Sequence, residues 1–262
     1  MTSAPASNCD AHNLPHLAGL LLDRLRREHT RVHALTNAAA QTFTANLLLA
    51  AGGIPSLTFA PEEVSAFTGS SAALLVNLGT LDTERRKAIL QAIATAHAQN
   101  KVWVLDPVFV DASSARLEFA RACLASKPTV LRCNASEFAA LAGTPAAPDA
   151  VKDFAKLRGT VVALTGAVDL VTDGIRIFRI GNGHPLMTRV TAMGCAATVL
   201  VAAFTALHGS AIEAAAAALL VTGVAGEIAA RDAKGPGTFQ PAFLDVLFTL
   251  DLSTLVTHGR AA

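Results

Sequence analysis

The sequence predicts a single α/β domain whose mostly parallel β-sheet is covered by helices on both faces. Apolar runs rich in Val, Leu and Ile recur along the chain without polar alternation, which is typical of parallel strands buried on both faces. Helical patterns of about 10–15 residues separate these runs. No Pro/Ser-rich linker and no break in composition divides the 262 residues, so we expect one domain rather than two.

Each element follows from its local pattern. The expected strands share an apolar run that ends at a polar or turn-forming residue: 31–37, 72–80, 101–108, 129–134, 159–166, and a hairpin over 168–181 that turns at Asp173-Gly174. The expected helices share an Ala- and Leu-rich pattern: 42–53, 82–100, 116–126, 194–208, 210–231, and a last helix after Pro241. Residues 1–14 lack both patterns, so we expect a flexible N-terminal arm before a single domain over 15–262.

Composition argues against several classes of function. The net charge of +1, from 21 basic and 20 acidic residues, provides no basic surface for nucleic acid. The richest apolar stretch, residues 196–207, is well short of the ~20 residues of a membrane span, and the N-terminus lacks the pattern of a secretion signal. Four scattered cysteines without a CxxC pair favour free thiols in a reducing compartment, so we expect a cytoplasmic protein.

Polar residues follow the strands at the point where each strand ends. They are Asn37, Asn77 with Gly79 and Thr80, Asp106 with Pro107, Arg132 with Asn134, and Thr165 with Gly166. In open α/β sheets, ligands bind beyond the carboxyl ends of the strands, so these residues predict a ligand site at one sheet edge. Each of them alone is also a common turn former, and a purely structural sheet could end in the same residues.

Two carboxylates at this edge allow two interpretations. Asp106 and Glu137 could hold hydrated Mg²⁺, which prefers one or two carboxylates together with water and phosphate oxygens. Alternatively, Asn134 and Glu137 have the spacing of a helix N-cap and its reciprocal partner. Arg132 at the same edge could bind a phosphate through two parallel hydrogen bonds.

The segment 191–195, Thr-Ala-Met-Gly-Cys, predicts a turn of mostly small residues that leads into a helix starting near Cys195. Backbone N–H groups at a helix N-terminus attract anions, including a phosphoryl group. The same field would lower the pKa of a thiol at this place. A buried, inert cysteine is the alternative, and it is the commoner situation for this residue type.

Several segments together resemble the hydroxyethylthiazole kinases. They include RVHALTNAAAQTFTANLLLAAGGIPSLTFAPEEV, ALLVNLGTL, VLDPV, LRCNASEFAALAG, VVALTGAVDLVTDG, NGHPLMTRVTAMGCAATVLVAAF and KGPGTFQ, in the same order and over about residues 15–250. The resemblance implies a ribokinase-like three-layer αβα sandwich. It also implies ATP-dependent phosphorylation of the hydroxyl of 4-methyl-5-(2-hydroxyethyl)thiazole in thiamin salvage, with Mg²⁺ and a homotrimer whose sites lie near subunit interfaces.

The resemblance also implies roles for residues, by position in these motifs. Those in contact with the thiazole alcohol are Asn37, Leu57, Gly79, Thr80, Ala192 and Gly194; those in contact with the nucleotide are Arg132 and Thr165; those associated with Mg²⁺ are Asp106 and Glu137; and the catalytic residue is Cys195. The backbone N–H groups of 192–195 would hold the γ-phosphoryl group, and Cys195 would orient or deprotonate the hydroxyl.

This chain departs from the usual family pattern at a few positions. The pattern T-G-x-G-C reads here with Ala192 and Met193, and alanine at that position requires a negative φ or room for its Cβ. Leu57 stands where Met is frequent, Cys133 replaces a glycine, and 109–112 replaces a run of small residues. These departures leave two alternatives open: a kinase for another small alcohol, such as a vitamin precursor, and a non-catalytic binder of thiazole or nucleotide.

Overall fold

The computed structural model describes residues 9–262 and contains one eight-stranded sheet, in the order β2-β1-β3-β4-β5-β6-β7-β8. The strands are β1 (Arg31–Leu35), β2 (Ile54–Ser56), β3 (Ala73–Asn77), β4 (Val102–Asp106), β5 (Val130–Asn134), β6 (Val161–Thr165), β7 (Asp169–Thr172) and β8 (Ile177–Ile180). The first six strands pair in parallel, and the β7–β8 hairpin adds two antiparallel strands. The predicted mostly parallel sheet and its terminal hairpin are confirmed.

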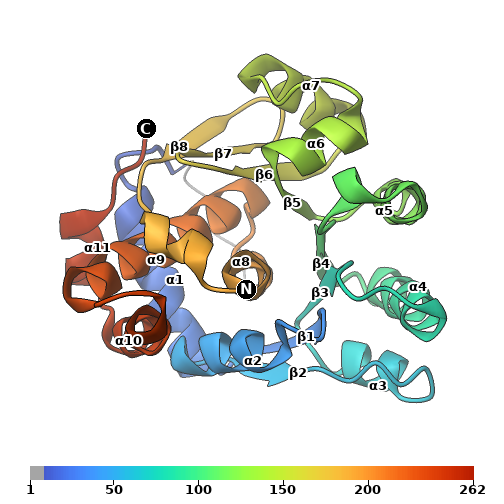
Figure 1. The fold of residues 1–262 in the computed structure, drawn as a ribbon, viewed down its shortest axis with the longest axis horizontal. Coiled ribbons are helices and arrows are strands. Elements are labelled where there is room, and N and C mark those ends of the chain that lie inside the picture. Colours follow the sequence, from blue (N-terminus) through green and yellow to red (C-terminus); the bar gives the residue numbers. More distant parts are fainter. Residues whose placement is uncertain (1–8) are drawn as a thin grey trace, which may run out of the picture.

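Helices cover both faces of this sheet (Figure 1). One layer holds α3 (Val64–Gly69), α4 (Thr83–Ala98), α5 (Ser114–Ala125), α6 (Ala135–Ala142) and α7 (Pro148–Arg158). The other holds α1 (Leu14–Glu28), α2 (Gln41–Ala50), α8 (Met193–Leu207), α9 (Ala211–Asp232), α10 (Pro236–Thr249) and α11 (Leu252–His258). Two short 3-10 helices, η1 (Val110–Ala112) and η2 (Pro185–Arg189), precede α5 and α8.

The period of two residues along a strand divides the interior into two cores. On β3, Ala73 and Leu75 belong to the core beneath α8 and α9, whereas Leu74 and Val76 belong to the core beneath α4. Trp103 is buried in the second core. Because both faces are apolar, the strands read as continuous hydrophobic runs, which is the pattern that identified them in the sequence.

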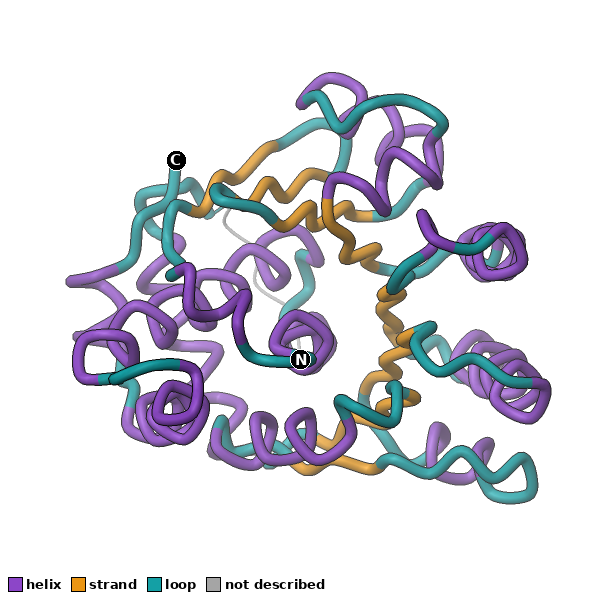
Figure 2. Tube along the Cα trace, in the orientation of Figure 1, coloured by secondary structure: helices purple, strands orange, loops and turns teal. Residues whose placement is uncertain are grey.

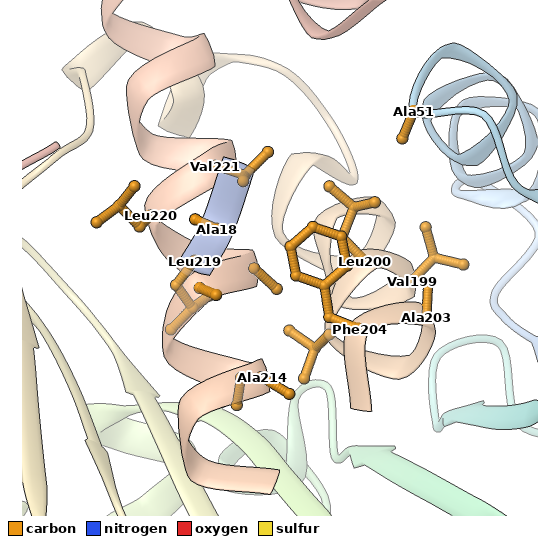
Figure 3. Packing of buried hydrophobic residues seen from close by; sticks show 14 of the residues in the cluster. Ala18, Ala51, Val199, Leu200, Ala203, Phe204, Ala214, Leu219, Leu220 and Val221 are labelled. Carbon is orange, nitrogen blue, oxygen red and sulfur yellow. The ribbon is translucent and has the colours of Figure 1, made fainter. Parts of the chain in front are cut away.

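The sheet curves around α8, whose end-on coil lies inside the arc of strands (Figure 2). Phe204 and Leu200 of α8 pack among Leu219, Leu220 and Val221 of α9 in the centre of this core (Figure 3). The 22-residue helix α9 is long and apolar enough to cross a membrane by length and composition, but 83% of its apolar window is buried within the fold. Helix α9 is therefore buried to the extent expected of a helix in the core of a globular fold.

The C-terminal helices differ from the prediction. The sequence suggested a helix after Pro241, but α10 begins at Pro236 and includes Pro241. A proline suits the first position of a helix, and a second one near the start removes only the hydrogen bond to the carbonyl four residues earlier. At the other end of the chain, residues 1–8 of the expected arm lie outside the described residues, and the backbone N–H of Cys9 donates to Glu213 at 3.3 Å.

Candidate active site

Two cavities, each of about 680 Å³, meet at the carboxyl edge of the sheet. The strand-end cavity is lined by the ends of β1, β3, β4 and β5 and by the start of α8: Asn37, Ala39, Gly79, Thr80, Asp106, Val108, Phe109, Arg116, Arg132, Asn134, Glu137, Met187, Thr188, Val190, Thr191, Ala192, Met193, Gly194 and Cys195. The hairpin-side cavity is lined by the β6–β7 turn, residues 182–188, α8 and α9, and includes Arg132, Thr165, Asp169, Asn182, Gly183, Gly194 and Gly223. Arg132, Met187, Thr188, Met193 and Gly194 line both, so the cavities adjoin at the N-terminus of α8.

A chain of side-chain hydrogen bonds joins the ends of β1, β3 and β4. The amide nitrogen of Asn37 donates to the side-chain oxygen of Asn77 at 3.0 Å, and the amide nitrogen of Asn77 donates to Oδ2 of Asp106 at 2.8 Å. The strands approach closely here because position 79 is glycine: a Cβ on Gly79 would lie 2.4 Å from Cβ of Asn37. The network fixes the Asp106 carboxylate at the floor of the strand-end cavity.

Asp106 is fully buried, and only one of its two carboxylate oxygens has hydrogen-bond partners within the described residues. Its Oδ2 accepts hydrogen bonds from Asn77 and from the hydroxyl of Thr198 at 3.0 Å, but its Oδ1 has no hydrogen-bond partner within residues 9–262. Burial raises the pKa of Asp106 to about 6, and the negative charge of Glu137 adds to this, while Arg132 and the two hydrogen bonds lower it. An unpartnered buried carboxylate oxygen that faces a cavity is suited to a cation or a donor group of a ligand.

Glu137 forms the capping box that the spacing allowed. Asn134 Oδ1 accepts from the Glu137 backbone N–H, and Glu137 Oε2 accepts from the Asn134 backbone N–H, both at 2.9 Å. Its second oxygen accepts from the backbone N–H of Phe109 at 3.1 Å. Each carboxylate oxygen has further lone pairs, so these bonds do not prevent Glu137 from also binding a metal-bound water.

The N-terminus of α8 presents free amides to both cavities. Within the described part of the chain, the backbone N–H groups of Gly194 and Cys195 have no hydrogen-bond acceptor, as expected for the first turn of a helix. The guanidinium of Arg132 lies against Gly194, since an added Cβ there would be 3.0 Å from its nitrogen. Positive charge and free amides at one point form an anion-binding site.

Ala192 has the backbone conformation that glycine would favour. Its φ is +64° at the N-cap of α8, so the negative φ that would ease an alanine at this position is not found. Met193 is buried in the core beneath α8 and lines both cavities. The chain therefore accommodates its Ala-Met pair at the cost of backbone strain at residue 192.

The expected lowering of the Cys195 pKa is wrong. Burial raises the pKa of the thiol to about 11, and the nearby charge of Asp106 raises it further, while contacts to Asn77 and Asn37 and the charge of Arg132 lower it. Desolvation disfavours the thiolate more than Asn77, Arg132 and Asn37 favour it. Cys195 is thus a neutral thiol at the wall of the strand-end cavity near pH 7.

The structure brings most of the proposed site residues together. Asn37, Gly79, Thr80, Asp106, Arg132, Glu137, Ala192, Gly194 and Cys195 line the strand-end cavity, and Arg132, Thr165 and Gly194 line the hairpin-side cavity. Leu57, just after β2, is half-buried against the core and is outside the lining that the described residues form. Thr80 has φ +49° and accepts a hydrogen bond from the backbone N–H of Ala38, which closes the turn after β3.

Sequence reasoning missed several residues that line these cavities, among them Phe109, Arg116, Met187 and Asp169. Phe109, Arg116 and Met187 lie in or just after loops without periodicity, so no pattern indicated their direction. Asp169 starts β7 in the hairpin-side cavity, where its Oδ1 accepts from the backbone N–H of Gly166 at 2.9 Å. Burial raises its pKa to about 6. A carboxylate three residues after a strand-end glycine was the only available signal.

Comparison with known proteins shows the family of the chain. The model of the hydroxyethylthiazole kinase family matches residues 22–253. The chain belongs to this family. Relatives at 44% and 46% identity are a probable hydroxyethylthiazole kinase of Agrobacterium fabrum, over 93% of this chain and 94% of the relative, and a hydroxyethylthiazole kinase of Cereibacter sphaeroides, over 92% and 97%.

Solved structures similar to this member of the hydroxyethylthiazole kinase family identify its fold. A hydroxyethylthiazole kinase structure from Pyrococcus horikoshii matches with a TM-score of 0.89 and 33% identity, over 94% of this chain and 98% of that one. A ribokinase-like superfamily protein of Enterococcus faecalis matches with a TM-score of 0.67 at 13% identity, over 96% and 92%. The second match shows the fold alone, and the fold is ribokinase-like.

Proposed function

We propose that the chain transfers the γ-phosphoryl group of ATP to the hydroxyl of 4-methyl-5-(2-hydroxyethyl)thiazole, a step of thiamin salvage. Membership in the hydroxyethylthiazole kinase family carries the proposal. The two adjoining cavities support it, because a kinase must hold a nucleotide and an acceptor alcohol on either side of one phosphoryl group.

The nucleotide occupies the hairpin-side cavity beside Thr165, and the alcohol occupies the strand-end cavity beside Asn37, Gly79 and Thr80. The γ-phosphoryl group lies at their junction, on the free amides of α8 and against Arg132. The alcohol oxygen forms a bond to the γ-phosphorus as the bond to the bridging oxygen breaks. The electron pair of that bond leaves with ADP, and the hydroxyl proton moves to an oxygen of the phosphoryl group.

The carboxylates fit a hydrated Mg²⁺. Oδ1 of Asp106 is buried and unpartnered at the cavity floor, and Glu137 lies across the same cavity with lone pairs available to a metal-bound water. When bound there, Mg²⁺ would neutralise charge on the phosphates. Asp106 orients its free oxygen through Asn77 and Thr198, which keep Oδ2 occupied.

Cys195 acts in this proposal as a neutral thiol that orients the alcohol, not as a thiolate base. We expect Cys195→Ala to lower kcat by about 10-fold and Cys195→Ser to retain most of it, because serine keeps a hydrogen-bonding group. The pH dependence of kcat should show no ionisation that Cys195→Ser removes between about pH 6 and 9. Loss of such an ionisation in the serine variant would assign the thiolate to the reaction.

We further propose a homotrimer in the cytoplasm. Sites near subunit interfaces would explain why Leu57 lies outside the cavities of its own chain. The four cysteines are free thiols, which fits a reducing compartment. A light-scattering mass of about three times 27.0 kDa is expected.

Coupled detection of ADP with a panel of small alcohols tests the activity. We expect ADP release that depends on the thiazole alcohol and on Mg²⁺. The bulk of Met193 in the lining of the strand-end cavity favours one alternative, a different small alcohol as acceptor. Turnover of another alcohol without turnover of the thiazole would establish that alternative, and binding of the thiazole without any ADP release would identify a non-catalytic binder.

A further inference from the structure

A second arginine, Arg116 of α5, lines the strand-end cavity. It lies in the first turn of α5, where its backbone N–H donates to the Ser113 hydroxyl at 3.4 Å. Its side chain is half-buried, and Nη1 donates to the carbonyl oxygen of Val108 at 2.8 Å. One hydrogen bond therefore fixes the guanidinium above the loop that follows β4.

The remaining donors of Arg116 are available to a ligand. A guanidinium has five N–H donors, and the carbonyl of Val108 uses one. Neither Arg116 nor Arg132 forms an ion pair with a carboxylate anywhere in residues 9–262. Both guanidinium groups line one cavity, where their free N–H donors suit an anionic ligand.

The cavity between the two arginines has the other features of a phosphate site. Asp106 lines it and has a buried carboxylate oxygen without a partner in residues 9–262, and Gly194 and Cys195, whose backbone amides are free, line it too. Arg132 approaches from β5 against Gly194, and Arg116 approaches from α5. Two guanidinium groups from two elements suit the several anionic oxygens of a triphosphate or a phosphate monoester.

We propose that Arg116 is a second phosphate-binding residue, which contacts the phosphoryl group in the strand-end cavity together with Arg132. This inference rests on the proposed function for its ligand, the phosphates of ATP and of the phosphorylated alcohol. Its contact with Val108 also positions the loop that contains Phe109, whose backbone N–H binds Glu137.

Three variants separate a charged contact from a structural tether. Arg116→Gln can still donate to the Val108 carbonyl but has no charge, whereas Arg116→Lys keeps the charge. Arg116→Ala removes both. We expect kcat/KM for ATP to fall about 10- to 100-fold in Arg116→Gln and Arg116→Ala, and Arg116→Lys to restore part of it. A tether alone predicts wild-type kinetics for Arg116→Gln, and that result would overturn the proposal.

Arg121 provides a matched control on the same helix. Its Nη2 donates to the carbonyl of Ala140 at 3.1 Å, and it is exposed and outside the cavity lining of the described chain. Arg121→Ala should therefore keep the wild-type kcat/KM. An equal loss in Arg121→Ala and Arg116→Ala would indicate a general effect on α5 and contradict a phosphate contact.

Direct binding keeps the test independent of the acceptor. Calorimetry with Mg-ATP alone should show at least 10-fold weaker binding to Arg116→Gln than to the wild type. If the wild type fails to turn over the thiazole alcohol yet binds Mg-ATP in this arginine-dependent way, the proposed acceptor is wrong and the role of Arg116 stands. Equal affinity of the wild type and Arg116→Gln for Mg-ATP would overturn that role.

Discussion

At the scale of single residues, Asp106 combines a stability cost with a functional position. Its carboxylate is buried, its pKa is raised to about 6, and one oxygen lacks a partner in the described chain. The folded state therefore binds a proton more readily than the unfolded state. Its ionised form destabilises the fold above about pH 6, and this cost disappears as the pH falls below about 4.

Asp106→Asn should therefore stabilise the metal-free protein and impair catalysis. Near pH 7.5 we expect the free energy of unfolding to rise on the order of 1–3 kcal/mol, because the variant has no buried charge. The gain should shrink towards pH 4.5, where the wild-type carboxyl is protonated. Urea unfolding of the wild type and the variant at both pH values measures this gain in stability. A gain that grows on acidification would contradict a raised pKa for Asp106. We also expect kcat of the variant to fall at least about 10-fold.

Ala192 carries backbone strain because its φ is positive. A φ of +64° costs an alanine roughly 1–2 kcal/mol, and glycine at this position would remove that cost. Part of the gain is offset because glycine increases the conformational entropy of the unfolded chain. We expect Ala192→Gly to raise the free energy of unfolding by about 0.5–1 kcal/mol. The control is Ala206→Gly within α8, also half-buried, which should lower it by about 1 kcal/mol. Destabilisation by both changes would show that residue 192 is not strained.

At the scale of elements, the chain near the C-terminus of α11 positions residues 182–183 in the wall of the hairpin-side cavity through hydrogen bonds. Asn182 donates to Oε2 of Glu227 at 3.0 Å and to the carbonyl of His258 at 2.9 Å, and its side-chain oxygen accepts from the backbone N–H of Arg260. Glu227 also accepts from Gly183 N–H at 2.9 Å and pairs with Arg260. Asn182 and Gly183 both line the cavity, so these contacts position its wall.

Arg260→Ala should weaken nucleotide binding without affecting the acceptor. Without the contact between Arg260 and Glu227, Asn182 is positioned less firmly in the wall of the hairpin-side cavity, which is the proposed nucleotide site. We therefore expect KM for ATP to rise about 3- to 10-fold and KM for the alcohol to stay unchanged. Lys87→Ala, which breaks the exposed 2.8 Å pair with Glu84 on α4, is the control and should change neither constant. Equal rises in both constants for Arg260→Ala would indicate general unfolding instead.

The sequence predicted helices and strands well where the hydrophobic pattern covered many residues, and poorly where it covered few. The five-residue strands β3 and β4 consist of an apolar run that ends at Asn77 or Asp106, so their ends could be located. The three-residue strand β2 contains Pro55, and α3 spans six residues, so neither has a readable period. Phe109 lies in a non-periodic loop and Arg116 in the first turn of the helix that follows it, so their place in the site depends on the tertiary course of that loop.

At the scale of the whole molecule, the strand order and the curvature of the sheet create the site. Parallel pairing places Asn77 opposite Asp106 and Asn134 opposite Thr165, so residues far apart in sequence share one edge. The sheet bends around α8 (Figure 1). Residues of the first turn of α8 line both cavities at that edge. Which residues follow strands is visible in the sequence, but the raised pKa of Cys195 is not, because it depends on burial by the assembled fold.

The most direct measurement is a crystal structure with the thiazole alcohol and a non-hydrolysable ATP analogue. We expect the nucleotide in the hairpin-side cavity, the γ-phosphoryl group on the amides of Gly194 and Cys195 beside Arg132, and the alcohol oxygen next to the Cys195 thiol. The adenosine part of the nucleotide in the strand-end cavity, or alcohol bound away from Cys195, would contradict the proposed division of the two cavities.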